Sequence, residues 1–136
     1  MYKTILVKDL VQEGENLINR LEARRFQIAA AFWHYIEDLM RWRLVIVFST
    51  LIEREGPLRA YMRIQEILEE MDAKALSVSD ISVMGLNGSA FRELRSEIER
   101  SGRVTSHRPM STSRDIWFHD VYIYRWRDGR PRPHRA

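Results

Sequence analysis

Two histidines near the end of the chain have the side chains best suited to acid–base chemistry. His107 and His119 lie in adjacent predicted strands, and Asp120 follows the second of them. A histidine pair that faces one cleft can act as general acid and general base on a phosphoester. The repeated histidine-x-threonine or histidine-x-serine pattern of two-histidine phosphoesterases is missing from the sequence. A small phosphoester hydrolase that uses these three residues is therefore an alternative interpretation, and we expect partly exposed strand histidines instead.

A glycine-containing turn between a predicted strand and a predicted helix has the local layout of a phosphate-binding site. It holds Gly85, Asn87, Gly88 and Ser89, and the free N–H groups of a helix N-terminus suit an anion. The sequence has neither the lysine and hydroxyl of a phosphate-binding loop nor the glycine spacing of a dinucleotide fingerprint. An N-cap at Asn87 or Ser89, together with left-handed glycines, explains the turn without a ligand. Gly88 and Ser89 are therefore only a secondary anion-binding candidate.

The sequence lacks the patterns that bind a metal ion. It has no pair of histidines at helical spacing and no regular aspartate loop. It also has no cysteine, which excludes disulfides, thiolate zinc sites and cysteine nucleophiles. A magnesium-dependent nuclease would need an acidic pair or a lysine on its second strand, which here reads Trp42-Arg43-Leu44. We therefore predict no metal, no cofactor and a non-catalytic binding or interaction module.

The predicted final strand, IWFHDVYIYRW, is rich in aromatic residues. Strict alternation places Phe118, Tyr122, Tyr124 and Trp126 on one of its faces. One face of the strand should pack on helices. An open aromatic face would form an interface with a protein partner or a second copy, or would stack single-stranded bases. We expect the interface, and hence a homodimer through this face or through a helix.

The chain ends in a basic segment that contains proline. The last twelve residues hold five arginines against one aspartate, so they account for the net charge of +3 and most of the high pI. We predict that residues 127–136 form a flexible tail. Its arginines, Arg127, Arg130, Arg132 and Arg135, would contact nucleic-acid phosphates without a fixed fold, although solvation is the simpler role of such charges. Nucleic-acid binding by this tail and the aromatic strand face is a further alternative.

The spacing of apolar residues predicts which segments form helices and which form strands. In chain order these are a helix over 7–24, strands over 26–36 and 42–49, a helix from Pro57 to 73, a strand over 76–84, a helix from 89 to about 102, and strands over 103–109 and 116–126. The sequence therefore predicts one α+β domain over residues 1–126. It should have one mixed, mostly antiparallel sheet of about five strands with three helices packed on it, in the order α-β-β-α-β-α-β-β.

Two of the predicted helices have residues that bear on packing and charge. In the helix that starts at Pro57, an apolar stripe should face the core; it consists of Leu58, Tyr61, Ile64, Ile67, Leu68 and Met71. The first helix ends with Arg20, Arg24 and Arg25, whose charges suit the negative end of the helix dipole and need no ligand. Gly14, in the middle of this helix, costs about 1 kcal/mol of helix propensity relative to alanine.

Four segments of the chain carry a resemblance to known proteins. They read WRLVI, GPLRAYMRIQEIL, SDISVM and VYIYR. In this order they are similar to segments of a group of small bacterial proteins without a characterised activity, and the similarity extends over most of the chain. The resemblance implies a shared fold and assigns no site residue.

The hydrophobic segments are too short for a membrane span or a signal peptide. The longest apolar run, Ile28 to Trp33, is six residues long, whereas a spanning helix needs about 20. The N-terminus reaches charged residues after only four apolar-leaning positions. We therefore predict a cytoplasmic protein that has no membrane partner.

Overall fold

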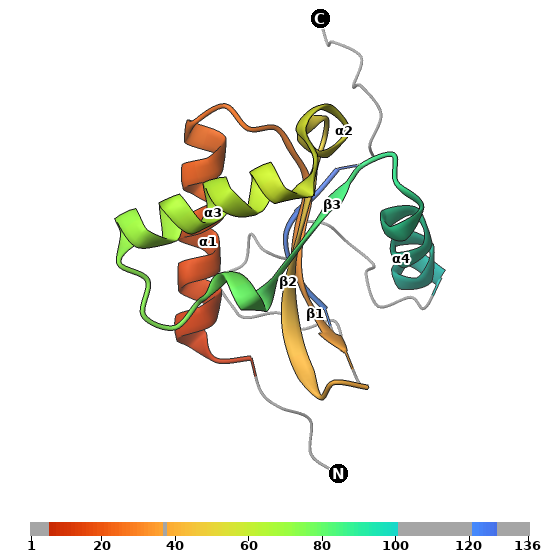
Figure 1. Ribbon diagram of the computed structural model, residues 1–136. Helices are drawn as coiled ribbons and strands as arrows, with labels where there is room; N and C mark the ends of the chain where they lie inside the picture. The colour runs from red at the N-terminus through yellow and green to blue at the C-terminus, as the bar shows by residue number, and fades with distance from the viewer. Residues whose placement is uncertain (1–5, 37, 101–120, 128–136) are drawn as a thin grey trace, which may run out of the picture.

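The computed structural model describes residues 6–36, 38–100 and 121–127. In chain order, its elements are α1 (Lys8–Ala23), β1 (Ile28–Ile36), β2 (Arg41–Phe48), α2 (Leu51–Glu55), α3 (Pro57–Met71), the short 3-10 helix η1 (Val78–Asp80), β3 (Ile81–Gly85), α4 (Ser89–Arg100) and β4 (Val121–Trp126). Helices and strands combine in one sheet-centred fold (Figure 1). The predicted α+β class is confirmed.

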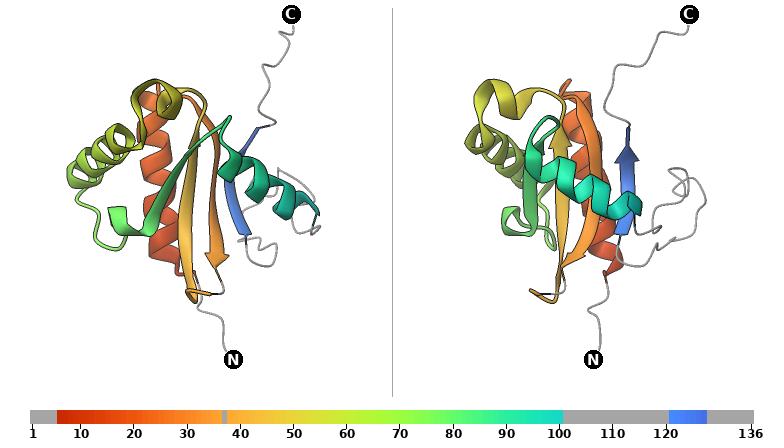
Figure 2. Two further views of the ribbon diagram at one scale, coloured as in Figure 1. Left: turned by 45° about the vertical axis from the view of Figure 1, so that its right-hand side comes forward. Right: turned by 90° about the vertical axis from the view of Figure 1, so that its right-hand side faces the viewer.

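One mixed, four-stranded sheet runs through the middle of the described structure, in the order β3-β2-β1-β4. β1 is antiparallel to both β2 and β4, and β2 is parallel to β3. Figure 2 shows α1 and α3 on one face of the sheet and α4 on the other. The described residues therefore form three layers, with the sheet between the helices.

The observed sheet differs from the predicted one in its strand count. The predicted strand over 103–109 lies outside the described residues, which hold four strands instead of five. β3 is parallel to its neighbour because α3 carries the chain back along the sheet between β2 and β3. The structure also has a short helix, α2, which apolar spacing did not predict, since its five residues are too few to show a helical period.

The central strand and the crossover helix form where their residues predict them. β2 lies between β1 and β3, and its run from Leu44 to Phe48 is buried, as expected for a strand covered on both faces. α3 begins at Pro57, directly after Gly56, whose φ of 87° suits glycine. Proline is favourable here because the first turn of a helix needs no N–H donor from it. The predicted helix start is therefore confirmed.

Each face of the sheet packs against its own apolar cluster. On the side of α1 and α3, the cluster includes the fully buried Trp33 and Phe48. On the side of α4, the ring of Trp126 makes edge-to-face contacts with Phe32 and Phe91, with centroids 5.4 and 6.4 Å apart. Within the described residues, no buried side-chain nitrogen or oxygen lacks a hydrogen-bond partner.

A register shift between β1 and β4 changes which side chains of β4 share a face. β4 has one extra residue, Tyr124, opposite the step from Ala31 to Phe32. As a result, Trp126 joins the cluster on the side of α4, whereas Tyr122 and Tyr124 pack against the cluster on the side of α1. The prediction that all three rings share one face is wrong for Trp126, because strict alternation does not continue through a bulge.

Side chains cover the outer edge of β3. The hydroxyl oxygen of Tyr61, on α3, accepts a hydrogen bond from the Val83 N–H at 3.2 Å. Arg43, on β2, donates to the carbonyl oxygens of Ser79 and Ile81 at 3.1 and 2.9 Å. Main-chain groups of β3 and of the segment before it therefore have side-chain partners within the domain.

Candidate functional site

Several of the predicted site residues lie outside the part of the chain that the structure describes. They are the catalytic alternative His107, His119 and Asp120, the predicted interface residue Phe118, and the tail arginines Arg130, Arg132 and Arg135. The hydrolase interpretation and most of the tail interpretation therefore stay predictions.

The glycine turn before α4 contacts a carboxylate of α2. Glu53 Oε2 accepts a hydrogen bond from the Asn87 N–H at 3.1 Å, and a Cβ on Gly85 would lie 2.6 Å from the same oxygen. Neither Gly85 nor Gly88 has a positive φ, so the prediction of left-handed glycines is wrong. Gly85 instead allows the close approach of Glu53. Because Glu53 is negatively charged, its position gives no support to the predicted anion site at Gly88 and Ser89.

Tyr124, a predicted interface residue, is half-buried, and its hydroxyl forms hydrogen bonds inside the domain. Its hydroxyl donates to the Val11 carbonyl oxygen at 2.6 Å and accepts from Trp33 Nε1 at 2.8 Å. Burial raises the pKa of Tyr124 well above its usual range. A Cβ on Gly14 would lie 2.5 Å from the hydroxyl oxygen. Tyr124 therefore joins β4 to β1 and α1, and Gly14 provides the space for it.

The other two described aromatic residues of the predicted interface are also covered in large part. Trp126 is 8% exposed. Tyr122 is half-buried, and its ring centroid lies 5.6 Å from that of Tyr124. These rings offer little free surface on which a base could stack, and their role as an interface stays a prediction.

Arg127, the first residue of the predicted tail, is attached to the sheet. Its N–H donates to the Ala29 carbonyl oxygen at 2.9 Å. Its guanidinium group contacts the Ile28 carbonyl oxygen and lies 3.3 Å from Glu22. Glu22 also pairs with Arg125 at 2.9 Å. The charge of Arg127 is therefore partly compensated within the folded domain.

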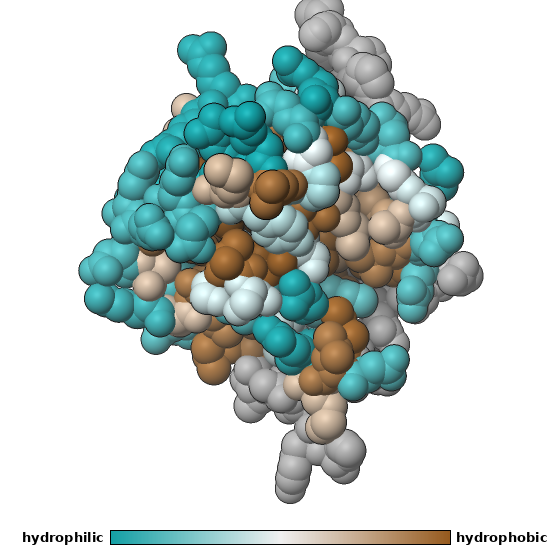
Figure 3. All heavy atoms as spheres, in the orientation of Figure 1, coloured by the Kyte–Doolittle hydropathy of each residue, from teal (hydrophilic) through white to brown (hydrophobic). Residues whose placement is uncertain are grey.

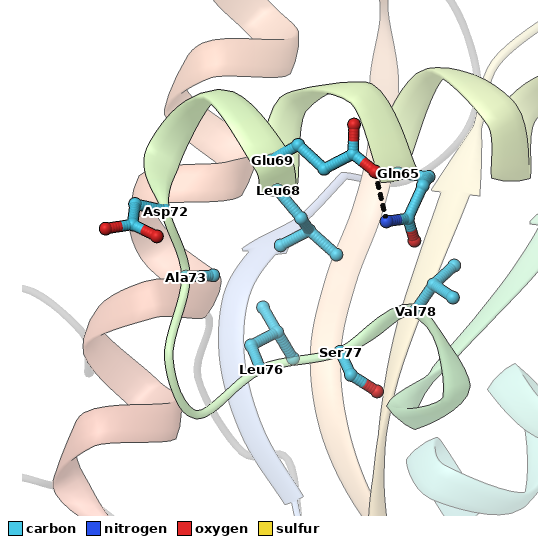
Figure 4. Close-up of a pocket in the computed structure, with 8 residues that line it drawn as sticks. All are labelled: Gln65, Leu68, Glu69, Asp72, Ala73, Leu76, Ser77 and Val78. Carbon is cyan, nitrogen blue, oxygen red and sulfur yellow. Dashed lines mark hydrogen bonds between the residues drawn. The ribbon is translucent and has the colours of Figure 1, made fainter.

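A groove of about 370 Å³ lies between the end of α3 and the segment that leads to η1 (Figure 4). Leu68 and Leu76 point toward one another in it and are 5% and 3% exposed. Gln65 and Glu69 lie above them on α3 and are joined by a hydrogen bond of 3.0 Å. The groove therefore has an apolar floor and a polar rim.

One carboxylate fixes the segment that forms the far wall of this groove. Glu13, on α1, accepts hydrogen bonds from the N–H groups of Lys74, Ala75 and Leu76 at 3.1, 3.0 and 2.8 Å. Burial disfavours the charged form of Glu13, but these donors and the nearby Lys74 ammonium group outweigh burial and lower its pKa. The position of this wall therefore depends on the ionised state of Glu13.

A second hollow, here called the arginine hollow, lies between the end of α1 and α2. It has a volume of about 300 Å³, and its polar lining consists of Arg24, Arg25, Gln27, Thr50, Arg54 and Glu55. The Ser49 N–H donates to the Gln27 carbonyl oxygen at 2.9 Å and so joins its two sides. The fold thus brings three arginines from two separate helix regions to one concave surface.

Arg25 occupies a position at which helices usually have glycine. Its φ is 72°, which is in the left-handed region. The Arg25 N–H donates to the Glu22 carbonyl oxygen and the Phe26 N–H to the Leu21 carbonyl oxygen, at 2.9 and 3.1 Å. These two hydrogen bonds form a Schellman motif, whose left-handed residue is most often glycine.

Replacing Arg25 by glycine should raise the free energy of unfolding by about 1 kcal/mol, because glycine adopts a positive φ without steric cost. Urea unfolding measures the change. Arg25→Ala is the matched control, since it removes the same charge and keeps the Cβ. An equal gain in the alanine variant would show that the charge, and not the backbone conformation, determines the effect.

The outer side of α3 exposes two large apolar side chains one helical turn apart. Leu58 is 70% exposed and Met62 is 51% exposed. Figure 3 shows apolar surface among polar residues on the side of the molecule that α3 and β3 form. Leu58 was predicted to join the buried stripe, and this prediction is wrong. Around the axis of α3, Leu58 lies beyond Tyr61 and outside the sector of the helix that faces the core. Ile64, Ile67 and Leu68 are buried as predicted.

Comparisons with protein-family models, with curated proteins and with solved structures find no match for this chain. In the described part of the chain, no helix has the length and apolar character needed to cross a membrane. Among the same residues, no three His, Cys, Asp or Glu side chains gather as metal ligands would. The proposals that follow rest on the side chains described above and their surroundings.

Proposed function

We propose that the chain is a non-catalytic binding module that forms a homodimer through the outer side of α3. The observation that carries this proposal is the exposure of Leu58 and Met62 one turn apart. The outer side of a surface helix normally has polar or charged residues, and burying two large apolar side chains against a second copy is favourable. The flexible side chain of Met62 can adapt to the partner surface.

The charges along α3 support an antiparallel contact between two copies. The first half of the helix has Arg59 and Arg63, and the second half has Glu66, Glu69 and Glu70. A twofold axis near the middle of α3 would bring the arginines of each copy close to the glutamates of the other. It would also place the two Met62 side chains near the axis, with each Leu58 against the second half of the partner helix. The present ion pairs of Arg59 with Glu55 and of Arg63 with Glu66 are exposed, so their exchange costs little.

Sedimentation equilibrium tests this proposal with the double substitution Leu58→Glu and Met62→Glu. The wild-type chain should form a dimer within the range of roughly 10 to 100 μM. The two glutamates place charge where apolar contact is expected, so they should raise the dimer dissociation constant by at least about tenfold. Far-UV circular dichroism checks that the variant keeps its helices.

Leu39→Glu provides the matched control for the α3 variant. Leu39 is 56% exposed and lies in the turn between β1 and β2, away from α3. Its replacement should leave dimer formation unchanged. A wild-type chain that is strictly monomeric at about 100 μM would contradict the proposal, and so would equal weakening by Leu39→Glu.

The other interpretations of the sequence stay predictions. Nucleic-acid binding by the tail and phosphoester hydrolysis by the histidine pair depend mainly on residues outside the described ranges. Binding of a different protein partner and a cytoplasmic location are likewise expectations from the sequence.

A further inference from the structure

The arginine hollow collects positive charge that is compensated only in part. Arg24 pairs with Glu70 on α3. Glu55, which also lines the hollow, pairs with Arg59 at 3.7 Å. Among the residues that the structure describes, Arg25 and Arg54 form no ion pair and no side-chain hydrogen bond. Two guanidinium groups that border the same hollow therefore have charge without an anionic partner.

Two features of this arrangement favour a bound anion. The hollow has three exposed arginines against one exposed glutamate, and opposite charges attract. Arg25 also adopts the left-handed conformation that glycine adopts at lower cost. Residues that depart from the locally stable choice concentrate at functional sites. We therefore assign any functional role of Arg25 to its side chain, because its backbone position favours glycine.

We propose that the arginine hollow binds the phosphate group of a small phosphorylated compound. The planar guanidinium group presents paired N–H donors that match the oxygens of a phosphate. Thr50 and Gln27 add a hydroxyl and an amide that can donate to the same group. The Thr50 side chain makes no capping hydrogen bond to α2, so its hydroxyl is available for this contact.

The remaining lining of the hollow suits the organic part of such a compound. Phe26 and Leu51, both half-buried, also line it. The volume of about 300 Å³ lies at the lower end of the range for ligand pockets, about 300 to 1,000 Å³. The hollow therefore offers apolar surface beside its arginines to a group joined to the phosphate. A dimer contact at α3 would change the partners of Arg24 and Glu55, but Arg25 and Arg54, whose guanidinium groups carry this proposal, form no ion pair with α3 in the described structure.

Titration of the full chain with inorganic phosphate at constant ionic strength tests the proposal. Amide NMR shifts should change in a saturable way at residues 24–27 and 50–55. Arg54→Gln should weaken phosphate binding by about tenfold, because it removes a charge-assisted contact. Arg25→Gly should weaken it similarly, and this variant keeps the backbone conformation of the helix end. Arg41→Gln, at the opposite end of β2 from Thr50, is the control and should leave the affinity within about twofold, as expected for a distant site.

Three outcomes would overturn the proposal. Shifts that chloride reproduces at equal ionic strength would show a general salt effect. Unchanged affinity in both Arg54→Gln and Arg25→Gly would place any phosphate elsewhere. Phenyl phosphate, whose ring can contact Phe26 and Leu51, should bind more tightly than inorganic phosphate. If it binds no more tightly, the hollow accepts a free anion and the proposed phosphorylated compound is wrong.

Discussion

Replacing Gly14 by alanine should lower the free energy of unfolding by about 2 kcal/mol, although alanine is the better helix former. The added Cβ would lie 2.5 Å from the hydroxyl oxygen of Tyr124 and 3.2 Å from Trp33 Nε1. Tyr124 would have to move and would lose its part-buried hydrogen bonds to Val11 and Trp33. This loss outweighs the gain of about 1 kcal/mol in helix propensity. Urea unfolding measures the difference.

A double substitution separates this clash from a general effect on α1. Tyr124→Phe removes the hydroxyl oxygen that the alanine would meet, and alone it should cost about 1 to 2 kcal/mol. Combined with Gly14→Ala, the total should be smaller than the sum of the single effects by about 1 kcal/mol. Gly88→Ala is the control, because its Cβ would meet only an ordinary contact of 3.5 Å. Additive effects at Gly14 and Tyr124 would contradict the explanation.

Replacing Glu13 by glutamine should lower the free energy of unfolding by about 2 kcal/mol at neutral pH. The carboxylate accepts three N–H groups from the segment after α3. A glutamine has one acceptor oxygen, and its amide nitrogen would face a donor. The N–H groups of Lys74 and Ala75 are partly accessible to water, which keeps the loss below that of fully buried bonds. Chemical unfolding of both chains at several pH values gives the measurement.

The effect of Glu13 should disappear in acid. Its folded-state pKa is lower than the ordinary value of 4.5, so the ionised carboxylate stabilises the fold fully above pH 4.5. This stabilisation is lost as the pH falls through the folded pKa. The difference between wild type and Glu13→Gln should therefore shrink below pH 4.5. Glu15→Gln, an exposed change on the same helix, is the control for the loss of one negative charge. A difference that stays constant to about pH 3 would contradict this role.

Apolar spacing predicted most of the described elements because their buried faces repeat with a helical or strand period. The prediction from apolar spacing was wrong where local hydrogen bonds determine the backbone conformation. The predicted strand over 76–84 begins only at Ile81, because Ser77 and Asp80 form a capping box that folds η1. Serine and aspartate often favour such local bonds over a sheet ladder. The register shift at Tyr124 is likewise invisible to alternation.

The candidate sites were less predictable than the fold. Arg25 and Arg54 are far apart in the sequence, and only the packing of α2 beside the end of α1 brings them to one hollow. No glycine marks the left-handed position at Arg25, so its Schellman motif had no signal in the sequence. Leu58 lies at the margin of an apolar stripe, where spacing does not separate a buried from an exposed side chain. The sequence marks Gly14 as costly for helix propensity, but the reason for a glycine at this position is its contact with Tyr124, which only the structure shows.

Tyr61 and Arg43 make β3 a poor template for a strand from another molecule. Uncovered edge strands recruit further strands and lead to fibrillar aggregates. To pair with β3, an incoming chain would have to displace the Tyr61 hydroxyl from the Val83 N–H and the Arg43 guanidinium group from the Ile81 carbonyl oxygen. This side of the sheet should therefore resist fibril growth in concentrated solution, because fibril seeds that elongate by edge pairing should not bind to it.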